Sequence, residues 1–356
     1  MKKGFFLIYL AIFLASPVTG QNYNTRDQTG ITDTIYKSFR LFENDSLLEI
    51  TLRFDLSVYF RTRPKKEYLP ANITFHLNET DSISRDIRLR TRGIFRKSFC
   101  LFPPIELNFK KTDFGYTDLD SITKLKLVTE CRSGKINEEY ILKEYMAYRL
   151  FNVLTDTSFR VRLLAINYLD TEKKRKPIRH YGIFIEPVEM LADRTNTFQI
   201  KSPNLTQKNI IPRIMDRMAI FNYMIGNYDW SIPGQHNVKI LKPGIFEPTG
   251  LAIAVPYDFD WTGLVDPSYA IPVEETGLES VRERLFTGIC RRREVFLKDL
   301  EIFSLKKEEF YRVINESPYL NQRVKKEVTT YLDGFFDQLA WKNIVIEDLL
   351  NSCKNF

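Results

Sequence analysis

The sequence predicts an α+β protein in two lobes, a strand-rich N-terminal lobe that contains one helix and a helix-rich C-terminal lobe. Apolar and polar residues alternate with a period of two from about residue 45 to residue 190, as they do in half-buried strands. From about residue 207 onward, apolar residues recur at helical spacing. The chain has 356 residues, 44% of them hydrophobic and 13% aromatic, which is enough for two domains or lobes with proper cores.

Residues 1–20 are expected to be a signal peptide. Lys2 and Lys3 precede an apolar run from Phe5 to Ala15, and small residues follow it. The run is too short for a permanent helix across a hydrocarbon core of ~30 Å, and no later apolar stretch is long enough. Removal leaves 50 basic against 45 acidic residues, a net charge of +5. We expect an exported protein, periplasmic or secreted, with no transmembrane span after signal removal; a retained N-terminal anchor is the alternative.

The first half of the remaining chain is divided into an N-terminal strand-rich extension, residues 21–80, and an N-lobe, residues 81–192. The extension either adds to the sheet of the lobe or forms a separate module. One helix is predicted at 137–154, with Ile141, Tyr145, Tyr148 and Phe151 on one face. Alternating apolar residues predict strands at 47–54, 73–77, 87–92, 105–110, 124–128, 161–166 and 181–185.

The second half, residues 193–356, is predicted to be a helical C-lobe that carries the catalytic and metal loops. Helical spacing is found at 210–225, 279–300, 305–317 and 319–350. Short strands with Pro and Gly turns interrupt this pattern between Val238 and Trp261.

Composition and charge exclude several classes of protein. Frequent aromatic residues, with only 15 Gly and 16 Pro, exclude disordered, collagen-like and linker-dominated chains. The whole-chain net charge of +7 is too mild for a dedicated nucleic-acid binder, so we expect no nucleic-acid partner.

The four cysteines are even in number and can be bridged in an oxidising compartment. None has a CxxC partner, and with only three His a structural zinc site is not expected. Proximity in the sequence favours pairing Cys100 with Cys131 and Cys290 with Cys353. Four buried free thiols are the alternative.

Two short segments carry the candidate chemistry. Residues 225–240 leave a helix, pass through a Gly/Pro loop with Asp229 and Asn237, and enter a strand. Residues 255–261 hold Asp258 and Asp260 two positions apart, which in a strand places both carboxylates on one side. Like charges so close call for a cation, and oxygen ligands suit Mg²⁺ or Mn²⁺.

Phosphoryl transfer needs the groups that these segments supply. It requires a carboxylate to orient the attacking hydroxyl, and an Asn and an Asp to hold metal on the phosphates. Asp229, Asn237 and the Asp258/Asp260 pair occur in this order within some thirty residues. The alternative is structural, because Asp and Asn are also ordinary turn residues.

These motifs resemble the atypical kinases of the spore coat protein H (CotH) type. The similarity lies in Gly226-Asn227-x-Asp229, His236-Asn237 and Tyr257-Asp258-Phe259-Asp260. With Arg92-Gly93, Cys100, Pro103-Pro104 and Lys124–Val128, the chain is similar to secreted bacterial proteins related to CotH. The Asp-loop-Asn arrangement is also similar to HipA-like and phosphoinositide kinases. The resemblance covers roughly residues 85–290 and implies a protein-kinase-like two-lobed fold.

The resemblance also implies a role for each matched residue. Asp229 would be the catalytic Asp, and Asn237, Asp258 and Asp260 would bind metal. The residues implied for ATP binding are Lys126 or Lys124 as the phosphate-binding Lys, Glu144 as its ion-pair partner with Glu139 in reserve, and Arg92 and Gly93 in the phosphate-covering loop. Two features depart from protein kinases: Gly93 is the only glycine of that loop, followed by basic Arg96 and Lys97, and the Asn follows the Asp by eight residues rather than five.

Simpler interpretations of these residues stay open. Lys124 and Lys126 alternate with leucines, as residues on the solvent face of a strand do. Lys143 and Glu144 also fit an exposed helix pair, and His236 fits a hydrogen-bonded structural role.

Together, these observations predict an exported, metal-dependent atypical kinase. It would transfer the γ-phosphoryl group of ATP, with Mg²⁺ or Mn²⁺, to a hydroxyl of a protein substrate in the envelope or outside the cell. Two alternatives are a non-catalytic kinase-like binding or envelope-assembly protein, and nucleotidyl transfer on the same fold.

Overall fold

The computed structural model describes residue 1 and residues 37–244, 250–341 and 344–355. Residues from Lys37 onward form one compact unit. The expected signal peptide, apart from Met1, lies outside the described residues. No helix in the described ranges has the length and hydropathy to cross a membrane.

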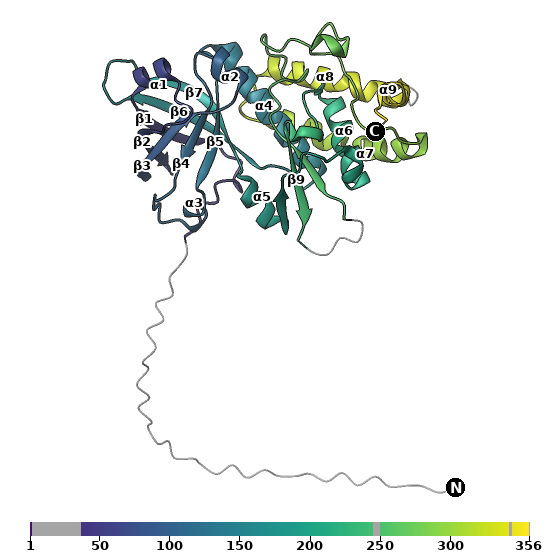
Figure 1. Cartoon of the computed structure of the whole chain (residues 1–356), viewed down its shortest axis with the longest axis horizontal. Coiled ribbons are helices and arrows are strands. Elements are labelled where there is room, and N and C mark those ends of the chain that lie inside the picture. The colour runs from purple at the N-terminus through teal and green to yellow at the C-terminus, as the bar shows by residue number, and fades with distance from the viewer. Residues whose placement is uncertain (2–36, 245–249, 342–343, 356) are drawn as a thin grey trace. The chain divides into compact units, whose positions relative to one another are not determined.

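Seven strands of the N-terminal half form a closed barrel in the order β1-β2-β3-β4-β5-β7-β6 (Figure 1). Strands β1 and β6 pair in parallel and close the barrel, whereas the other neighbours are antiparallel. Inward side chains such as Ile50, Ile73 and Leu107 fill the interior. The strands are β1 (Leu48–Phe54), β2 (Leu69–His76), β3 (Ser82–Thr91), β4 (Ile105–Asn108), β5 (Lys124–Thr129), β6 (Val161–Asp170) and β7 (Ile178–Ile185).

The segment assigned as an N-terminal extension contributes β1 and β2 to this barrel. Ile50 of β1 pairs with Phe75 of β2 on one side and with Ile166 of β6 on the other. Because β1 joins β2 to β6, the described part of this segment extends the sheet and is not a separate module.

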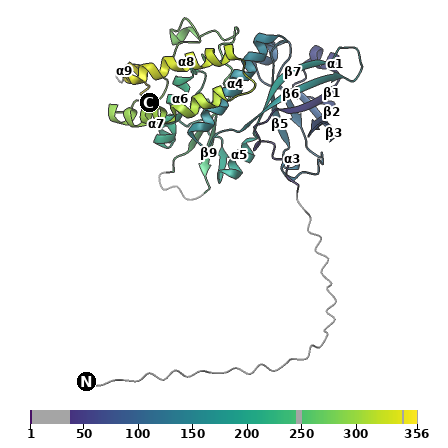
Figure 2. The ribbon, with the colours of Figure 1, turned by 180° about the vertical axis from the view of Figure 1, so that it is seen from behind.

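The helix predicted at 137–154 is α4 (Lys135–Leu154), and it is buried on nearly all sides. It packs against β6 and β7 and also against α7 of the helical half. Figure 2 shows α4 between the strands and the C-terminal helices. The prediction of one apolar face was too narrow, because Lys143 and Glu144 are buried as well. The alternative of an exposed Lys143–Glu144 pair is therefore wrong.

The C-terminal half combines helices with a three-stranded sheet in the order β10-β9-β8. One hydrophobic core joins this sheet, α4 and the C-terminal helices. Its elements are α5 (Val188–Arg194), β8 (Thr197–Ile200), α6 (Pro212–Met224), β9 (Val238–Pro243), β10 (Ile253–Pro256), α7 (Arg293–Asn315), α8 (Gln322–Ala340) and α9 (Ile344–Ser352). Shorter turns of helix are α1 (Leu56–Thr62), α2 (Phe95–Phe99), α3 (Thr117–Asp120) and the 3₁₀ turns Gln207–Asn209, Pro233–Gln235 and Glu274–Thr276.

The helix predicted at 279–300 is wrong in its first half. Residues 278–292 are irregular, and α7 begins only at Arg293 and continues through the break predicted near residue 300. Arg284 donates to the carbonyls of Met224 and Tyr331, and Cys290 is bridged to Cys353. These long-range contacts hold the segment in an irregular path despite its helical spacing.

Both predicted disulfides are present. Cys100 is bridged to Cys131 and Cys290 to Cys353, with Cα–Cα distances of 4.6 and 4.9 Å. The alternative of four free thiols is therefore wrong.

Candidate active site

The loop that carries Asp229 is held by the side chain of Asn227. The fully buried Asn227 donates through Nδ2 to Asn222 Oδ1 at 2.9 Å, and its Oδ1 accepts the N–H of Asp229 at 3.0 Å. Gly226 turns the chain at the end of α6 with φ of 66°, and a Cβ there would lie 2.2 Å from Tyr331 Oη. Gly226 and Asn227 thus shape the turn that presents Asp229.

Asp229 is oriented by two partners from the start of β9. Asn237 donates through Nδ2 to Asp229 Oδ2 at 2.9 Å and to the Asp229 carbonyl at 2.8 Å. His236 Nε2 lies 2.8 Å from Asp229 Oδ1, which confirms its expected hydrogen-bonded role. Burial raises the pKa of Asp229, and His236 works against this rise. A carboxylate with a raised pKa and a fixed orientation is suited to accept a proton.

Asp258 lies next to Asn237 because β9 and β10 are antiparallel neighbours. The N–H of Tyr257 donates to the Asn237 carbonyl at 3.0 Å, and the N–H of Asp258 donates to Tyr148 Oη of α4 at 2.8 Å. The backbone of Asp258 is left-handed, with φ of 67°. Such a conformation is uncommon outside glycine and is concentrated at functional sites.

The expectation that Asp258 and Asp260 alternate along a strand was wrong. Strand β10 ends at Pro256, and the left-handed Asp258 interrupts any alternation. Asp258 is held through its backbone N–H at Tyr148, whereas the Asp260 carboxylate is held at Arg96 and Tyr269. Burial, and in addition the charge of Asp258, raises the pKa of Asp260 and of Asp229. Tertiary packing, and not strand geometry, therefore sets the position of each residue.

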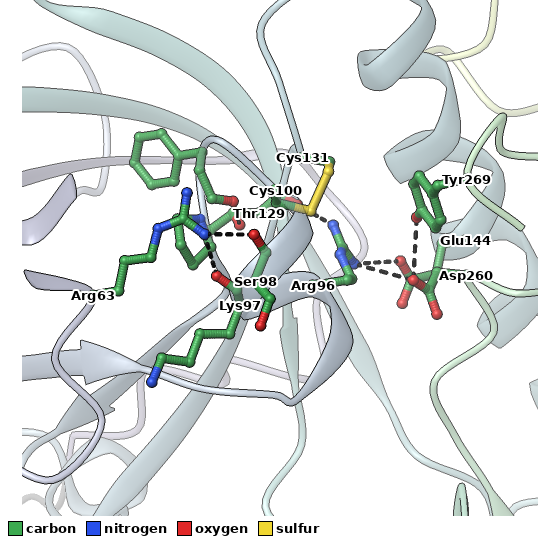
Figure 3. Close-up of a disulfide and its surroundings, with 12 residues drawn as sticks. Arg63, Arg96, Lys97, Ser98, Cys100, Thr129, Cys131, Glu144, Asp260 and Tyr269 are labelled. Atoms are coloured by element: carbon green, nitrogen blue, oxygen red, sulfur yellow. Dashed lines mark hydrogen bonds and ion pairs between the residues drawn. A yellow bond between two sulfur atoms is a disulfide. The ribbon is translucent and has the colours of Figure 1, made fainter. Parts of the chain in front are cut away.

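Glu144 of α4 meets Asp260 through Arg96 of α2 (Figure 3). Arg96 Nη1 lies 3.6 Å from Glu144 Oε2 and 3.7 Å from Asp260 Oδ2, and Tyr269 Oη donates to the same Asp260 oxygen at 3.1 Å. Burial raises the pKa of Glu144 and of Asp260, and Arg96 opposes the rise in both.

The predicted ion pair between Lys126 and Glu144 is not formed. Among the described residues, the ion-pair partner of Glu144 is Arg96. In the sequence, Arg96 stands out only as a basic residue in a loop that is glycine-rich in protein kinases. Its contact with Glu144 could not be foreseen, because the two residues lie far apart along the chain. The reserve residue Glu139 is ion-paired with Arg323 of α8 instead.

Lys126 belongs to a group of cations around the Tyr257 ring. Its Nζ lies 4.6 Å from the ring centre, and Nζ of Lys239 on β9 lies 5.2 Å from the same centre. Burial lowers the pKa of Lys126 to about 8, with further repulsion from Arg92 and Lys239. We call Arg92, Lys126 and Lys239 the basic cluster; the sequence analysis had missed Lys239. Converging cations of this kind are suited to bind an anion.

Two other residues that the sequence predicts for ATP binding, Lys124 and Gly93, make few contacts at the site. The side chain of Lys124 is exposed on β5 and makes no hydrogen bond or ion pair with a described residue. Gly93 follows β3 with φ of 82° and has no atom within 4 Å of the position of a Cβ. The loop after β3 is therefore open at Gly93.

The oxygen ligands at this site fit a cation whose coordination shell is completed by a substrate. No three His, Cys, Asp or Glu side chains in the described ranges are arranged to hold a metal by themselves. Mg²⁺ is commonly bound by one or two carboxylates together with substrate phosphates and water. No described residue donates a hydrogen bond to the Asp258 carboxylate or to Asn237 Oδ1, so these oxygens remain available as metal ligands.

Comparisons with known proteins add little to this geometry. No protein-family model matches the chain, and no curated protein matches its sequence. Among solved structures, a Helicobacter pylori proinflammatory kinase, CtkA, aligns over 79% of this chain and 90% of its own, with 10% identity and a TM-score of 0.37. A likeness this distant carries no argument about fold or function. The comparisons thus assign the chain to no family, and the geometry of the site is the basis from which its function must be inferred.

Proposed function

We propose that this protein is an exported, metal-dependent kinase that transfers the γ-phosphoryl group of ATP to a hydroxyl of a protein substrate. The observation that carries the proposal is the position of Asn237. Its side chain holds Asp229, and its carbonyl accepts the N–H of Tyr257 beside Asp258. One residue thereby connects the candidate base with the candidate metal loop, the two parts that phosphoryl transfer requires near each other.

Each group then has a defined task. Asp229, held by Asn237 and His236, orients the attacking hydroxyl and accepts its proton. The basic cluster binds the phosphates of ATP. Asp258, Asp260 and Asn237 Oδ1 would hold Mg²⁺ or Mn²⁺. When bound, the metal would neutralise charge on the phosphates.

Export is supported by the two disulfides and by the pattern of residues 1–20. Disulfides persist in oxidising compartments and are rare in the cytosol. We therefore place the protein substrate in the envelope or outside the cell.

The proposal is tested by incubating the protein with γ-³²P ATP and Mn²⁺ or Mg²⁺, followed by mass spectrometry of the labelled product. We expect metal-dependent label transfer, and a loss of about 100-fold or more in Asp229→Asn, because the attacking hydroxyl loses its base. Asp156→Asn, an exposed residue, is the matched control. Label from α-³²P ATP would indicate nucleotidyl transfer instead. Absence of any ATP-induced thermal shift, with or without metal, would contradict the proposal.

Lys126 and Lys124 offer a second matched pair within this experiment. Both lie on β5, but only Lys126 lies beside Tyr257 and the other cations. We expect Lys126→Met to raise KM for ATP and Lys124→Met to leave it unchanged. Equal effects in both variants would remove the basic cluster from the ATP site.

A further inference from the structure

Arg96 joins parts of the chain that are far apart in sequence. It contacts Glu144 on α4 and Asp260 after β10 through the same Nη1 atom, and its Nη2 donates to the carbonyl of Thr129 at the end of β5. Its side chain is 11% exposed, while those of Glu144 and Asp260 are 1% and 11% exposed. Two carboxylates this deeply buried would repel each other without a cation between them. Arg96 therefore sets the position of Asp260 relative to α4.

The helix that carries Arg96 is not anchored by a buried face of its own. None of the five residues of α2 is buried, and Phe95 and Phe99 are 44% and 40% exposed. A segment with so little buried apolar surface has low local stability. Its placement comes from the ring contacts of Phe95 and Phe99 with Trp261 and Tyr269, and from further contacts that tie α2 to the rest of the chain.

One of these anchors is the disulfide between Cys100 and Cys131. Cys100 directly follows α2, and Cys131 lies between β5 and α4 (Figure 3). The N–H of Phe102 donates to the Cys131 carbonyl at 3.0 Å, which extends the same connection. On the other side of α2, Arg63 donates to the carbonyls of Lys97 and Ser98.

The disulfide also belongs to the small core beneath the Asp260 loop. Cys100 and Cys131 are buried together with Tyr140, Val265 and Tyr269. Tyr269 is also the donor to Asp260. The bridge therefore supports both partners of the contact: α2 with Arg96 on one side, and the Asp260–Tyr269 segment on the other.

We propose that Arg96 is a positioning residue of the phosphotransfer site and that the Cys100–Cys131 disulfide holds it in place, so that the site is fully assembled only in the oxidised protein. This inference rests on the proposed kinase function. Reduction by dithiothreitol breaks the Sγ–Sγ bond, forms two thiols and oxidises one dithiothreitol to its cyclic disulfide. Arg96 then loses its fixed position, and Asp260 is no longer held against α4.

The test compares the two disulfides of the same chain. We expect Cys100→Ser/Cys131→Ser and Arg96→Met to lower kcat for γ-phosphoryl transfer by about 100-fold, the loss that a displacement of ~1 Å in a catalytic site can bring. Arg96→Lys should restore part of the activity, because it keeps the charge without the planar fork. Cys290→Ser/Cys353→Ser is the matched control, because it removes a disulfide away from α2. It should retain kcat even where Tm falls.

The combined variant decides whether the disulfide acts through Arg96. If it does, adding Arg96→Met to Cys100→Ser/Cys131→Ser lowers kcat little further, because effects on one coupled unit do not add. Full additivity, or wild-type kcat in Arg96→Met, would overturn the inference.

A second measurement separates this inference from the proposed function. Hydrogen exchange of residues 262–269 should become faster in Arg96→Met and in Cys100→Ser/Cys131→Ser, but not in the control. If the wild-type protein transfers no phosphate, the proposed function fails, and hydrogen exchange still tests the coupling of disulfide, Arg96 and Asp260. Unchanged exchange in both variants would refute that coupling.

Discussion

At the scale of single residues, the site depends on polar side chains whose backbone is left-handed. Asn237 and Asp258 have φ of 50° and 67°. Asn and Asp accept this conformation more readily than most residues, because their short side chains can hydrogen-bond locally. Each is fixed by a neighbour: Asn237 by Asp229, and Asp258 by Tyr148. The residue types therefore serve the backbone geometry as well as the chemistry.

A buried pair on the barrel makes stability depend on pH. Burial raises the pKa of Glu130 to about 8 and lowers that of His180 to about 4. Between the ordinary pKa of a Glu and about 8, the folded protein binds more protons than the unfolded chain. The unfolding free energy contributed by Glu130 therefore falls as pH rises through this window. His180 acts in the opposite direction, but only below its ordinary pKa of 6.5.

Glu130→Gln isolates this effect. We expect the unfolding free energy of wild type to fall, relative to that of Glu130→Gln, between pH 6.5 and about 8, and the difference to stay constant above that. Urea unfolding at several pH values measures it. Parallel curves for the two proteins across this range would show that Glu130 is already ionised in the fold.

At the scale of elements, α4 is the helix around which the site is arranged. It contributes Glu144 to the Arg96 contact and Tyr148 to the Asp258 loop. It is also tied to α8, because Lys143 pairs with Glu327 and Glu139 pairs with Arg323. A shift of α4 relative to α8 would move Glu144 and Tyr148 together.

Because the two members of the Lys143–Glu327 pair differ in burial, we expect neutralising one or the other to lower the unfolding free energy by different amounts. Lys143 is 2% exposed and Glu327 31% exposed, with 2.5 Å between Nζ and Oε1. Glu327→Gln leaves a buried ammonium without its charge partner, whereas Lys143→Met leaves a carboxylate that reaches solvent. We expect Glu327→Gln to lower the unfolding free energy more, by about 1–3 kcal/mol. Chemical unfolding compares them, and a larger loss in Lys143→Met would contradict this account.

At the scale of the whole molecule, closure of the barrel links the beginning of the described chain to its middle. Strand β1 pairs with β2 and, in parallel, with β6, more than a hundred residues later. Barrel closure removes the exposed strand edges that would otherwise lie on β2 and β6. The strand that carries Lys126 is part of the same closed sheet.

Two truncated chains test whether the fold depends on β1. A chain that starts at Lys37 keeps every described strand, and we expect it to show the cooperative unfolding of the full chain. A chain that starts at residue 56 lacks β1, and we expect it to aggregate or to lose near-UV circular dichroism because two strand edges are exposed. Cooperative unfolding of the shorter chain, with native near-UV signal, would show that β1 is dispensable.

Local patterns in the sequence only favoured the two disulfide pairs and left free thiols open, but they determined the types of most elements and the two loops with Asp229, Asn237, Asp258 and Asp260. They succeed there because strand alternation, helical spacing and turn chemistry act between residues that are close along the chain. Tertiary structure alone decided that Arg96 contacts Glu144, that Lys239 joins Lys126 at Tyr257, and that residues 278–292 are not helical. These outcomes depend on contacts between residues far apart along the chain, and the cost of leaving a buried polar or charged group without a partner can exceed a local preference.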